Sequence, residues 1–248
     1  MTQAELLAFQ ETLVFTLSEP DRSARAGISR TDLMGISPGM VDLLASLALG
    51  KRIEKVTKIL RKTCAYLQSD LEELAAPFAA RHPPIRPDSF YNACQFYSFL
   101  RHRWRVHFPN PSFLPDLAYC ELAMIAVERG IRSERLSRLR LGSDELLKIR
   151  RHPAAHFHRC EYNIQKLLDG TDPDGSTVPR EPVCLILSQP LSETVPKVFQ
   201  INDQLFALLR SWHAWSVHSS QDLLQEGPQC EFWQKLERLG FIEVVPCV

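Results

Sequence analysis

The feature that most constrains the fold is a short, wholly apolar run directly after a proline. Pro182 precedes residues 183–187, which read Val-Cys-Leu-Ile-Leu. This run has the length of a strand that is buried on both faces. A second, partly alternating stretch covers residues 195–201, and Pro196 within it predicts a strand at the edge of a sheet. The sequence therefore predicts a small sheet with one buried strand and one edge strand.

Three short helices and a closing strand are predicted after these two strands. Cap residues, apolar spacing and the glycine-proline breaks place the helices at about 202–212, 219–226 and 228–239. Gly240 ends the third helix, and the strand covers 241–245. Strands that flank three short helices predict a winged-helix-like module. Such a module binds nucleic acid with a helix, or an extended peptide at a sheet edge.

Length and composition restrict the class of protein. The chain has 248 residues, is 45% hydrophobic, and carries 29 Lys and Arg against 29 Asp and Glu. This balance disfavours nucleic-acid binding, because proteins that bind nucleic acid usually carry an excess of basic residues. No apolar run approaches the roughly 18 residues that a membrane span requires. No signal-peptide pattern stands at the N-terminus, so a cytoplasmic location is predicted.

The remaining chain predicts an α+β protein that is mostly helical. Apolar periodicity predicts a helical N-terminal domain over 1–108, a helix and connector over 109–180, and the winged-helix-like domain over 181–248. We expect a helix break at Gly50-Lys51 and a short helical piece from Ser143 to Ile149. The aromatic residues between 90 and 104 follow helical spacing, which favours a core helix over a cofactor site.

No group of residues predicts catalysis or metal binding in this chain. His152, His156 and His158 resemble metal ligands, but Pro153 follows the first of them and no zincin glutamate or cysteine pair is near. The seven cysteines are dispersed, which is typical of reduced thiols packed in cores. Nucleophile-elbow, phosphate-loop and dinucleotide patterns are missing. We therefore predict neither catalytic residues nor a cofactor or metal in this chain.

Basic residues gather in the middle of the sequence. Between residues 95 and 160 there are twelve Lys and Arg but only six Asp and Glu. A solvated helix face is one explanation, and an acidic partner, either a phosphate backbone or a protein surface, is the other. If the basic residues contact an acidic partner, the predicted interface consists of Arg101, Arg103, Trp104, Arg105, Arg132 and Arg135.

The last helix and the two predicted strands offer a peptide-binding surface. Phe232 and Trp233 are neighbours, so both cannot face one core, and one of them can line a groove beside an open strand. Alternatively, Trp233 packs against Trp212 or Trp215. The residues predicted to contact a peptide are Leu185, Leu187, Lys197, Phe199, Phe232, Trp233 and Leu236.

The order of several short motifs resembles the DUF2063 family, whose members carry the label of a DNA-binding domain. The motifs are Leu7-Ala8-Phe9-Gln10, Val41-Asp42-Leu43-Leu44, His82-Pro83-Pro84, Pro87-Asp88, Phe99-Leu100, Leu114-Pro115-Asp116-Leu117-Ala118, His152-Pro153, Phe206-Ala207-Leu208-Leu209 and Leu239-Gly240-Phe241. They span nearly the whole chain. The run Ala154-Ala155-His156-Phe157-His158 departs from the family pattern, as does the polar arm near the N-terminus.

The resemblance implies a role in the biosynthesis of a natural product. Members of the family accompany DUF692 proteins, which are TIM-barrel enzymes with two or three irons. There they resemble a RiPP recognition element, which holds the leader of a ribosomally made peptide while the partner oxidises a cysteine. Methanobactin and 3-thiaglutamate biosynthesis use such pairs. By size the chain resembles the partner subunit of the thiaglutamate pathway, whose iron enzyme excises the β-carbon of a C-terminal cysteine.

Two hypotheses from different classes therefore stay open. In the first, the chain is a non-catalytic subunit of a heterodimer with the iron enzyme and binds the precursor leader by β-strand addition. In the second, it is a winged-helix transcriptional regulator that binds DNA. Neutral overall charge and the predicted edge strand favour the first hypothesis.

Overall fold

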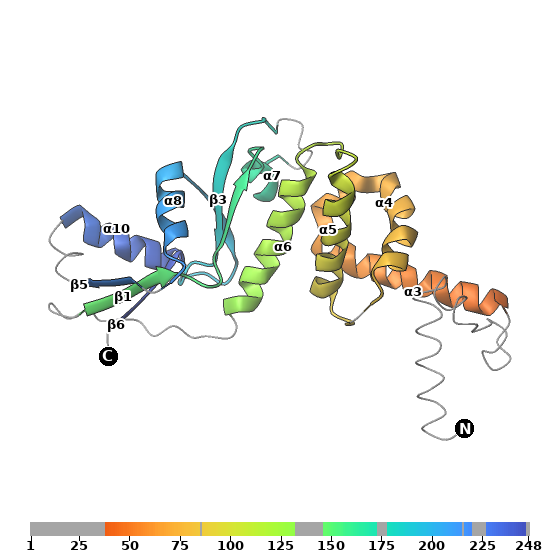
Figure 1. Ribbon diagram of the computed structural model, residues 1–248, viewed down its shortest axis with the longest axis horizontal. Helices are drawn as coiled ribbons and strands as arrows, with labels where there is room; N and C mark the ends of the chain where they lie inside the picture. Colours follow the sequence, from red (N-terminus) through yellow and green to blue (C-terminus); the bar gives the residue numbers. More distant parts are fainter. Residues whose placement is uncertain are drawn as a thin grey trace, which may run out of the picture. The chain divides into compact units, whose positions relative to one another are not determined.

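The protein is an α+β chain with long helices and small antiparallel sheets (Figure 1). The computed structural model describes residues 38–84, 86–131, 146–172, 178–214, 216–219 and 227–246. The helix predicted over 219–226 lies largely outside these residues, and so does the first motif, Leu7 to Gln10. The described chain forms two compact units, residues 1–118 and 119–248.

The first unit is helical. Its described elements are α3 (Pro38–Ile59), α4 (Arg61–Arg81), α5 (Ser89–Trp104) and the beginning of α6 (Leu114–Ile131). The side chain of Asp88 caps α5 by accepting a hydrogen bond of 2.8 Å from the backbone N–H of Tyr91. Phe78 packs edge-on against Phe96, with ring centroids 5.0 Å apart. The aromatic helix is thus a core helix, as its spacing predicted.

The predicted break at Gly50-Lys51 is wrong. Helix α3 continues through Gly50 to Ile59. One glycine in a helix costs only about 1 kcal/mol relative to alanine, and the buried residues Val56 and Leu60 anchor the end of α3 in the core. Packing over the following turns therefore outweighs the local preference of one residue.

The second unit contains two three-stranded antiparallel sheets. Sheet A has the order β5-β1-β6 and sheet B the order β2-β3-β4. The elements of this unit, after α6, are β1 (Leu146–Arg151), β2 (His156–Cys160), α7 (Gln165–Leu168), β3 (Val183–Ser188), β4 (Lys197–Ile201), α8 (Asp203–Ser211), β5 (Ser216–Ser219), α10 (Gly227–Arg238) and β6 (Ile242–Pro246).

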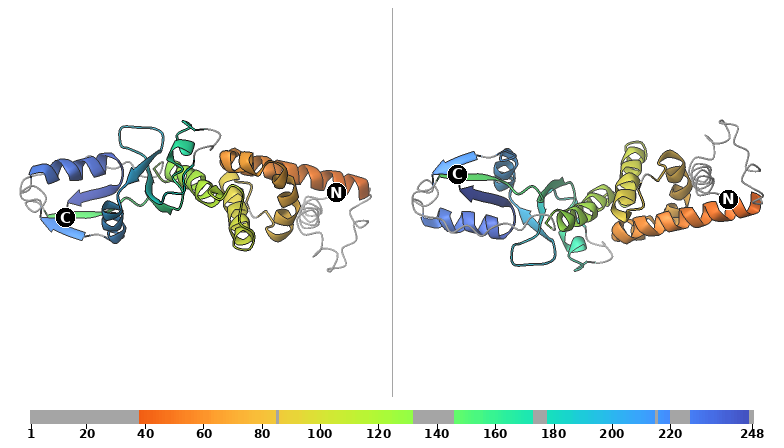
Figure 2. Two further views of the ribbon diagram at one scale, coloured as in Figure 1. Left: turned by 90° about the horizontal axis from the view of Figure 1, so that it is seen from above. Right: turned by 90° about the horizontal axis from the view of Figure 1, so that it is seen from below.

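Helices α8 and α10 cover one face of sheet A (Figures 1 and 2). Leu209 on α8 and Leu236 on α10 belong to one buried cluster with Ile149 on β1 and Val244 on β6. Asn202 caps α8 through a 2.8 Å hydrogen bond from the backbone N–H of Leu205, as the sequence predicted. The amphipathic stripes of the two helices thus close the core over the sheet.

The helical piece predicted from Ser143 to Ile149 is wrong over its described part. Residues 146–151 form β1, the central strand of sheet A, which pairs with β5 and β6. Ile149 lies opposite Ser216 on one side and Val244 on the other. These partners are distant in sequence, so the periodicity of the segment itself could not reveal them.

The sequence predicted a domain boundary before Glu181, but the second unit is not divided there. Strand β1 pairs with β6, and β2 pairs with β3 in the register His156 to Leu187. Residues 146–160 therefore supply one strand to each sheet of the C-terminal region. The last third of the chain shares both sheets with the preceding segment and is not a separate module.

Candidate functional site

Strand β4 is an edge strand. It pairs with β3 in the register Ile186 to Phe199, and sheet B has no further described strand beyond it. Pro196 stands directly before Lys197, the first residue of β4. This confirms the edge position that the proline predicted. Main-chain N–H and C=O groups on the outer side of an edge strand are available to a strand from another chain.

The side chains of β4 divide between core and solvent. The Phe199 ring lies edge-on to Phe241, with centroids 5.1 Å apart, and Ile201 also packs against the buried cluster. Lys197 is exposed and its Nζ forms an ion pair of 2.7 Å with Glu193. One face of β4 thus anchors the strand in the core, while its residues Lys197 and Gln200 remain accessible.

Exposed apolar side chains lie in the loop that leads into β4. Leu191 is 52% exposed and Val195 is 62% exposed. The loop is held to the end of α10, because the backbone N–H of Leu191 donates to the carbonyl of Arg238 at 2.9 Å. The prediction from sequence missed both residues, although Leu191 follows a proline and Val195 precedes one, which are positions typical of exposed turns.

Three residues predicted to contact a peptide belong to the core instead. Leu185 and Leu187 are 0% exposed on β3, the central strand of sheet B, and Leu236 is 2% exposed. Their side chains cannot reach a peptide without unfolding of the sheet. An apolar run predicts burial, but burial in the central strand excludes the direct contact that we expected.

The two neighbouring aromatics of α10 point in different directions. Trp233 packs on Trp212, with ring centroids 5.0 Å apart, which confirms the core alternative for this residue; Trp215 lies outside the described residues. The indole N–H of Trp233 is buried and has no acceptor among the described residues. Phe232 is 37% exposed and its ring touches that of Trp233 at 5.4 Å. Phe232 is thus the aromatic that stays accessible.

The predicted partner interface is only partly accessible. Arg101, Arg103 and Arg105 are exposed at the C-terminal end of α5. The prediction that Trp104 contacts a partner is wrong, because its side chain is buried in the core while its neighbours on α5 are exposed. Arg132 and Arg135 lie outside the described residues. Their role in contacting a partner stays a prediction.

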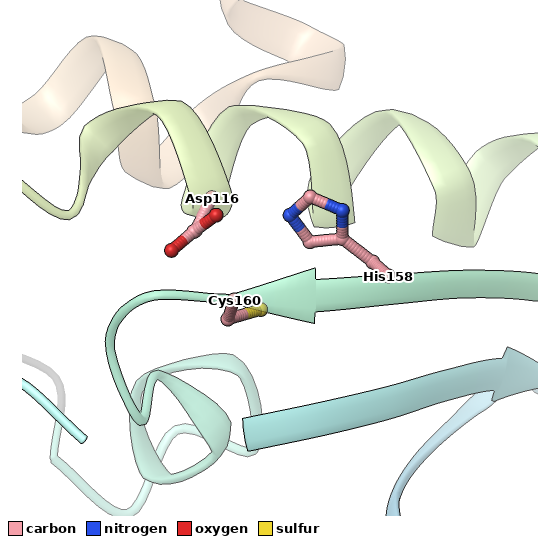
Figure 3. Close-up of side chains that lie close together, drawn as sticks. All are labelled: Asp116, His158 and Cys160. Carbon is pink, nitrogen blue, oxygen red and sulfur yellow. The ribbon is translucent and has the colours of Figure 1, made fainter. Parts of the chain in front are cut away.

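Two of the three sequence-predicted histidines, His156 and His158, lie on β2. Figure 3 shows His158 and Cys160 on β2, beside helix α6; Asp116, also labelled there, is part of the first unit. The imidazole of His158 stacks on the Tyr119 ring at 4.1 Å. Among the described residues of the second unit, no three His, Cys, Asp or Glu side chains converge on one point. Zinc in proteins takes at least three protein ligands.

The surroundings of His156 on β2 act on its protonation. Burial, together with the positive charge of Arg151, lowers the pKa of its imidazole. Arg151 itself lies over the Phe157 ring at 5.0 Å. Both causes disfavour the charged form of His156, which lies on β2 of sheet B. His152 is also buried, at the turn between β1 and β2.

Two comparisons with known proteins found no match. No protein-family model matches the sequence, and no curated protein matches it. The resemblance to the DUF2063 family therefore stays a prediction based on the order of short motifs. Within the described part of the chain, no helix has the length and hydropathy of a membrane span.

Proposed function

We propose that this chain is a non-catalytic subunit that binds the leader of a ribosomally made precursor peptide. In the proposal, the leader adds as a strand to β4, and the chain presents the peptide to a DUF692-type iron oxygenase that modifies a cysteine. The β-carbon excision at a C-terminal cysteine is the reaction that the resemblance suggests. The iron belongs to the partner, with which this chain would form a heterodimer in the cytoplasm.

The observation that carries the proposal is the outer side of β4 next to exposed apolar side chains. Strand addition draws its affinity from main-chain hydrogen bonds and its specificity from side-chain contacts along the new strand. Here β4 is an edge strand that pairs with β3 alone among the described strands, and the exposed Leu191 and Val195 precede it. By contrast, Ile242, Glu243 and Val244 of β6, at one edge of sheet A, are buried.

Binding the leader would accelerate the partner's reaction without chemistry in this chain. A tethered substrate experiences a higher effective concentration at the reacting site than the same peptide free in solution. A winged-helix description is part of this proposal: α8 and α10 lie on one face of a small antiparallel sheet, and β6 follows α10 directly. The exposed arginines of α5 are the proposed contact with the enzyme.

The direct test uses fluorescence polarisation with a labelled leader from a precursor encoded beside this protein's gene. The double variant Leu191→Asp/Val195→Asp should weaken binding about tenfold or more, because two apolar contacts are lost. Leu208→Asp is the matched control, since Leu208 is 40% exposed on α8 and belongs neither to the loop nor to β4. We expect the control to bind like the wild type.

Hydrogen exchange separates strand addition from other modes of binding. A leader that pairs with β4 should slow the exchange of amides in residues 197–201. A leader that binds while these amides stay unprotected would exclude strand addition. Failure of the chain to co-purify with a co-expressed iron-barrel protein would exclude the delivery role. Duplex DNA that binds more tightly than the leader, with a steep salt dependence, would instead support the regulator.

A further inference from the structure

A cavity of about 290 Å³ lies entirely within the first unit. It opens between the middle of α3 and the segment that leads into α5. The residues that line it are Ala48, Lys51, Arg52, Lys55, Pro84, Arg86, Pro87 and Asn92. A volume of this size is near the lower end of the range for small-molecule sites. None of these lining residues belongs to β4 or to the proposed peptide site.

The lining of the cavity is strongly basic. Half of the lining residues are Lys or Arg, and none is Asp or Glu. Glu54 on α3 forms an ion pair of 2.7 Å with Lys51, in which both side chains are exposed, and its charge also interacts with Lys55 and Lys58. Lys55 and Arg86 form no ion pair with any carboxylate of the described residues. The cavity therefore carries an excess of positive charge.

Arg52 is the buried member of this group. It is 7% exposed, and its guanidinium donates from Nε to Asn92 Oδ1 and from Nη2 to Gln95 Oε1, both at 2.9 Å. Both acceptors are neutral amides. The guanidinium also lies over the Phe78 ring, 4.1 Å from its centroid. Burial lowers the pKa of Arg52 to about 10.

A buried cation without a counterion is unusual, because desolvation of a charge is costly unless an opposite charge compensates it. The two amide contacts use only part of the donor capacity of a guanidinium. Within the described residues, Arg52 has no carboxylate partner. An anion in the cavity would supply the missing charge and accept the remaining N–H groups.

We propose that this cavity binds the phosphate group of a small molecule or free inorganic phosphate. Arginine binds the oxygens of such a group in a fixed, forked geometry, and lysine adds a mobile point charge. The cavity contains both types, with Arg52 at its buried end and Lys55 and Arg86 at its margin. The bound phosphate would link α3 to the start of α5.

The test is to add inorganic phosphate to the full chain. Calorimetry measures its binding, and the midpoint of thermal unfolding measures its effect on stability. Chloride at the same ionic strength corrects for general screening. We expect phosphate to bind and to raise the unfolding midpoint more than chloride does. Lys55→Gln and Arg86→Gln should each weaken phosphate binding about tenfold, because each removes a charge-assisted contact.

Lys58→Gln is the matched control. Lys58 is exposed on the same helix but does not line the cavity, so this variant should bind phosphate like the wild type. An equal loss in all three variants would overturn the proposal, since it would indicate a diffuse surface effect. An effect of phosphate no greater than that of chloride would overturn it as well.

Titration with glycerol 3-phosphate distinguishes the phosphate group of a small molecule from free inorganic phosphate as the ligand. Tighter binding of the ester than of inorganic phosphate would identify the phosphate of an organic molecule as the ligand. Equal or weaker binding of the ester would identify the free ion. Both results require that Lys55 and Arg86 contribute and that Lys58 does not.

Discussion

The two units contain buried charges that are treated in opposite ways. In the second unit, Glu243 on β6 is 8% exposed, and Arg150 on the neighbouring strand β1 donates to it at 2.7 Å from Nε. Arg150 and Glu243 lie directly opposite each other on the paired strands β1 and β6. In the first unit, Arg52 is equally buried, and among the described residues it contacts the amides of Asn92 and Gln95 and the Phe78 ring but no carboxylate. Strand pairing in the second unit gives Glu243 its counterion, Arg150. In the first unit, the cavity beside Arg52 has room for an anion.

The two units also differ in the space around one glycine each. Gly50 on α3 has open space where a Cβ would stand. Gly240, which follows α10, has a φ of +71°, and a Cβ there would lie 2.5 Å from the carbonyl oxygen of Gln189. Gly240 therefore stands where a side chain would overlap the backbone, whereas Gly50 is exposed on α3 and has solvent at that position.

Exchanging each glycine for alanine tests this contrast with the largest expected effect. Gly240→Ala should lower the free energy of unfolding by about 3 kcal/mol, because it combines a left-handed backbone with a steric overlap. Gly50→Ala should raise it by up to about 1 kcal/mol through helix propensity. Urea denaturation measures both. A neutral Gly240→Ala would contradict the close approach to Gln189.

Removing each buried charge is expected to give the next largest difference. Glu243→Gln should cost about 2 kcal/mol, since it leaves the partly buried Arg150 without its counterion. Arg52→Met should cost less than about 1 kcal/mol, because it removes a desolvated charge while water in the cavity can donate to Asn92. Denaturation curves of the two variants provide the comparison. Equal costs would show that Arg52 is already compensated.

Acid should destabilise both units by a smaller amount. Burial, then Arg52 and then Arg81, lower the pKa of His82, and burial with Arg151 lowers that of His156. The unfolded chain, with a histidine pKa near 6.5, then binds more protons than the folded chain. Stability contributed by the neutral imidazoles is therefore present above that pH and is lost as the pH falls through it.

Variants of the two histidines assign this pH dependence. His82→Gln and His156→Gln should each flatten the fall in stability between about pH 7.5 and pH 5.5, measured by urea denaturation at each pH. His107→Gln, at an exposed histidine that follows α5, should leave the slope unchanged. A slope that persists in the double variant of His82 and His156 would assign it to other groups.

Local chemistry predicted much of the second unit correctly. The apolar run after Pro182 is a buried strand, the strand after Pro196 is at an edge, and Asn202 caps α8. Each of these features is encoded within a few residues, by apolar content, by a proline that cannot donate, or by a side chain that accepts from the backbone. The edge position of β4, on which the proposed peptide site depends, belongs to this group.

Features that depend on distant partners were predicted wrongly or missed. Residues 146–149 were expected to be helical because nothing local indicates that β5 and β6 pair with them. Leu185 and Leu187 were expected to touch a peptide, although β2 and β4 enclose their strand on both sides. The basic cavity escaped notice because Arg52 and Arg86 are far apart in sequence and helical packing alone brings them together.

The sequence by itself determined which segments are buried, where most helices begin and which strand lies at an edge, because these properties follow from residue type and short-range spacing. Only the tertiary structure decided which strands pair, which apolar residues stay accessible, and where a cation is buried with no carboxylate partner among the described residues. Strand partners and the surroundings of a charge are set by contacts between residues tens of positions apart, which no local pattern specifies.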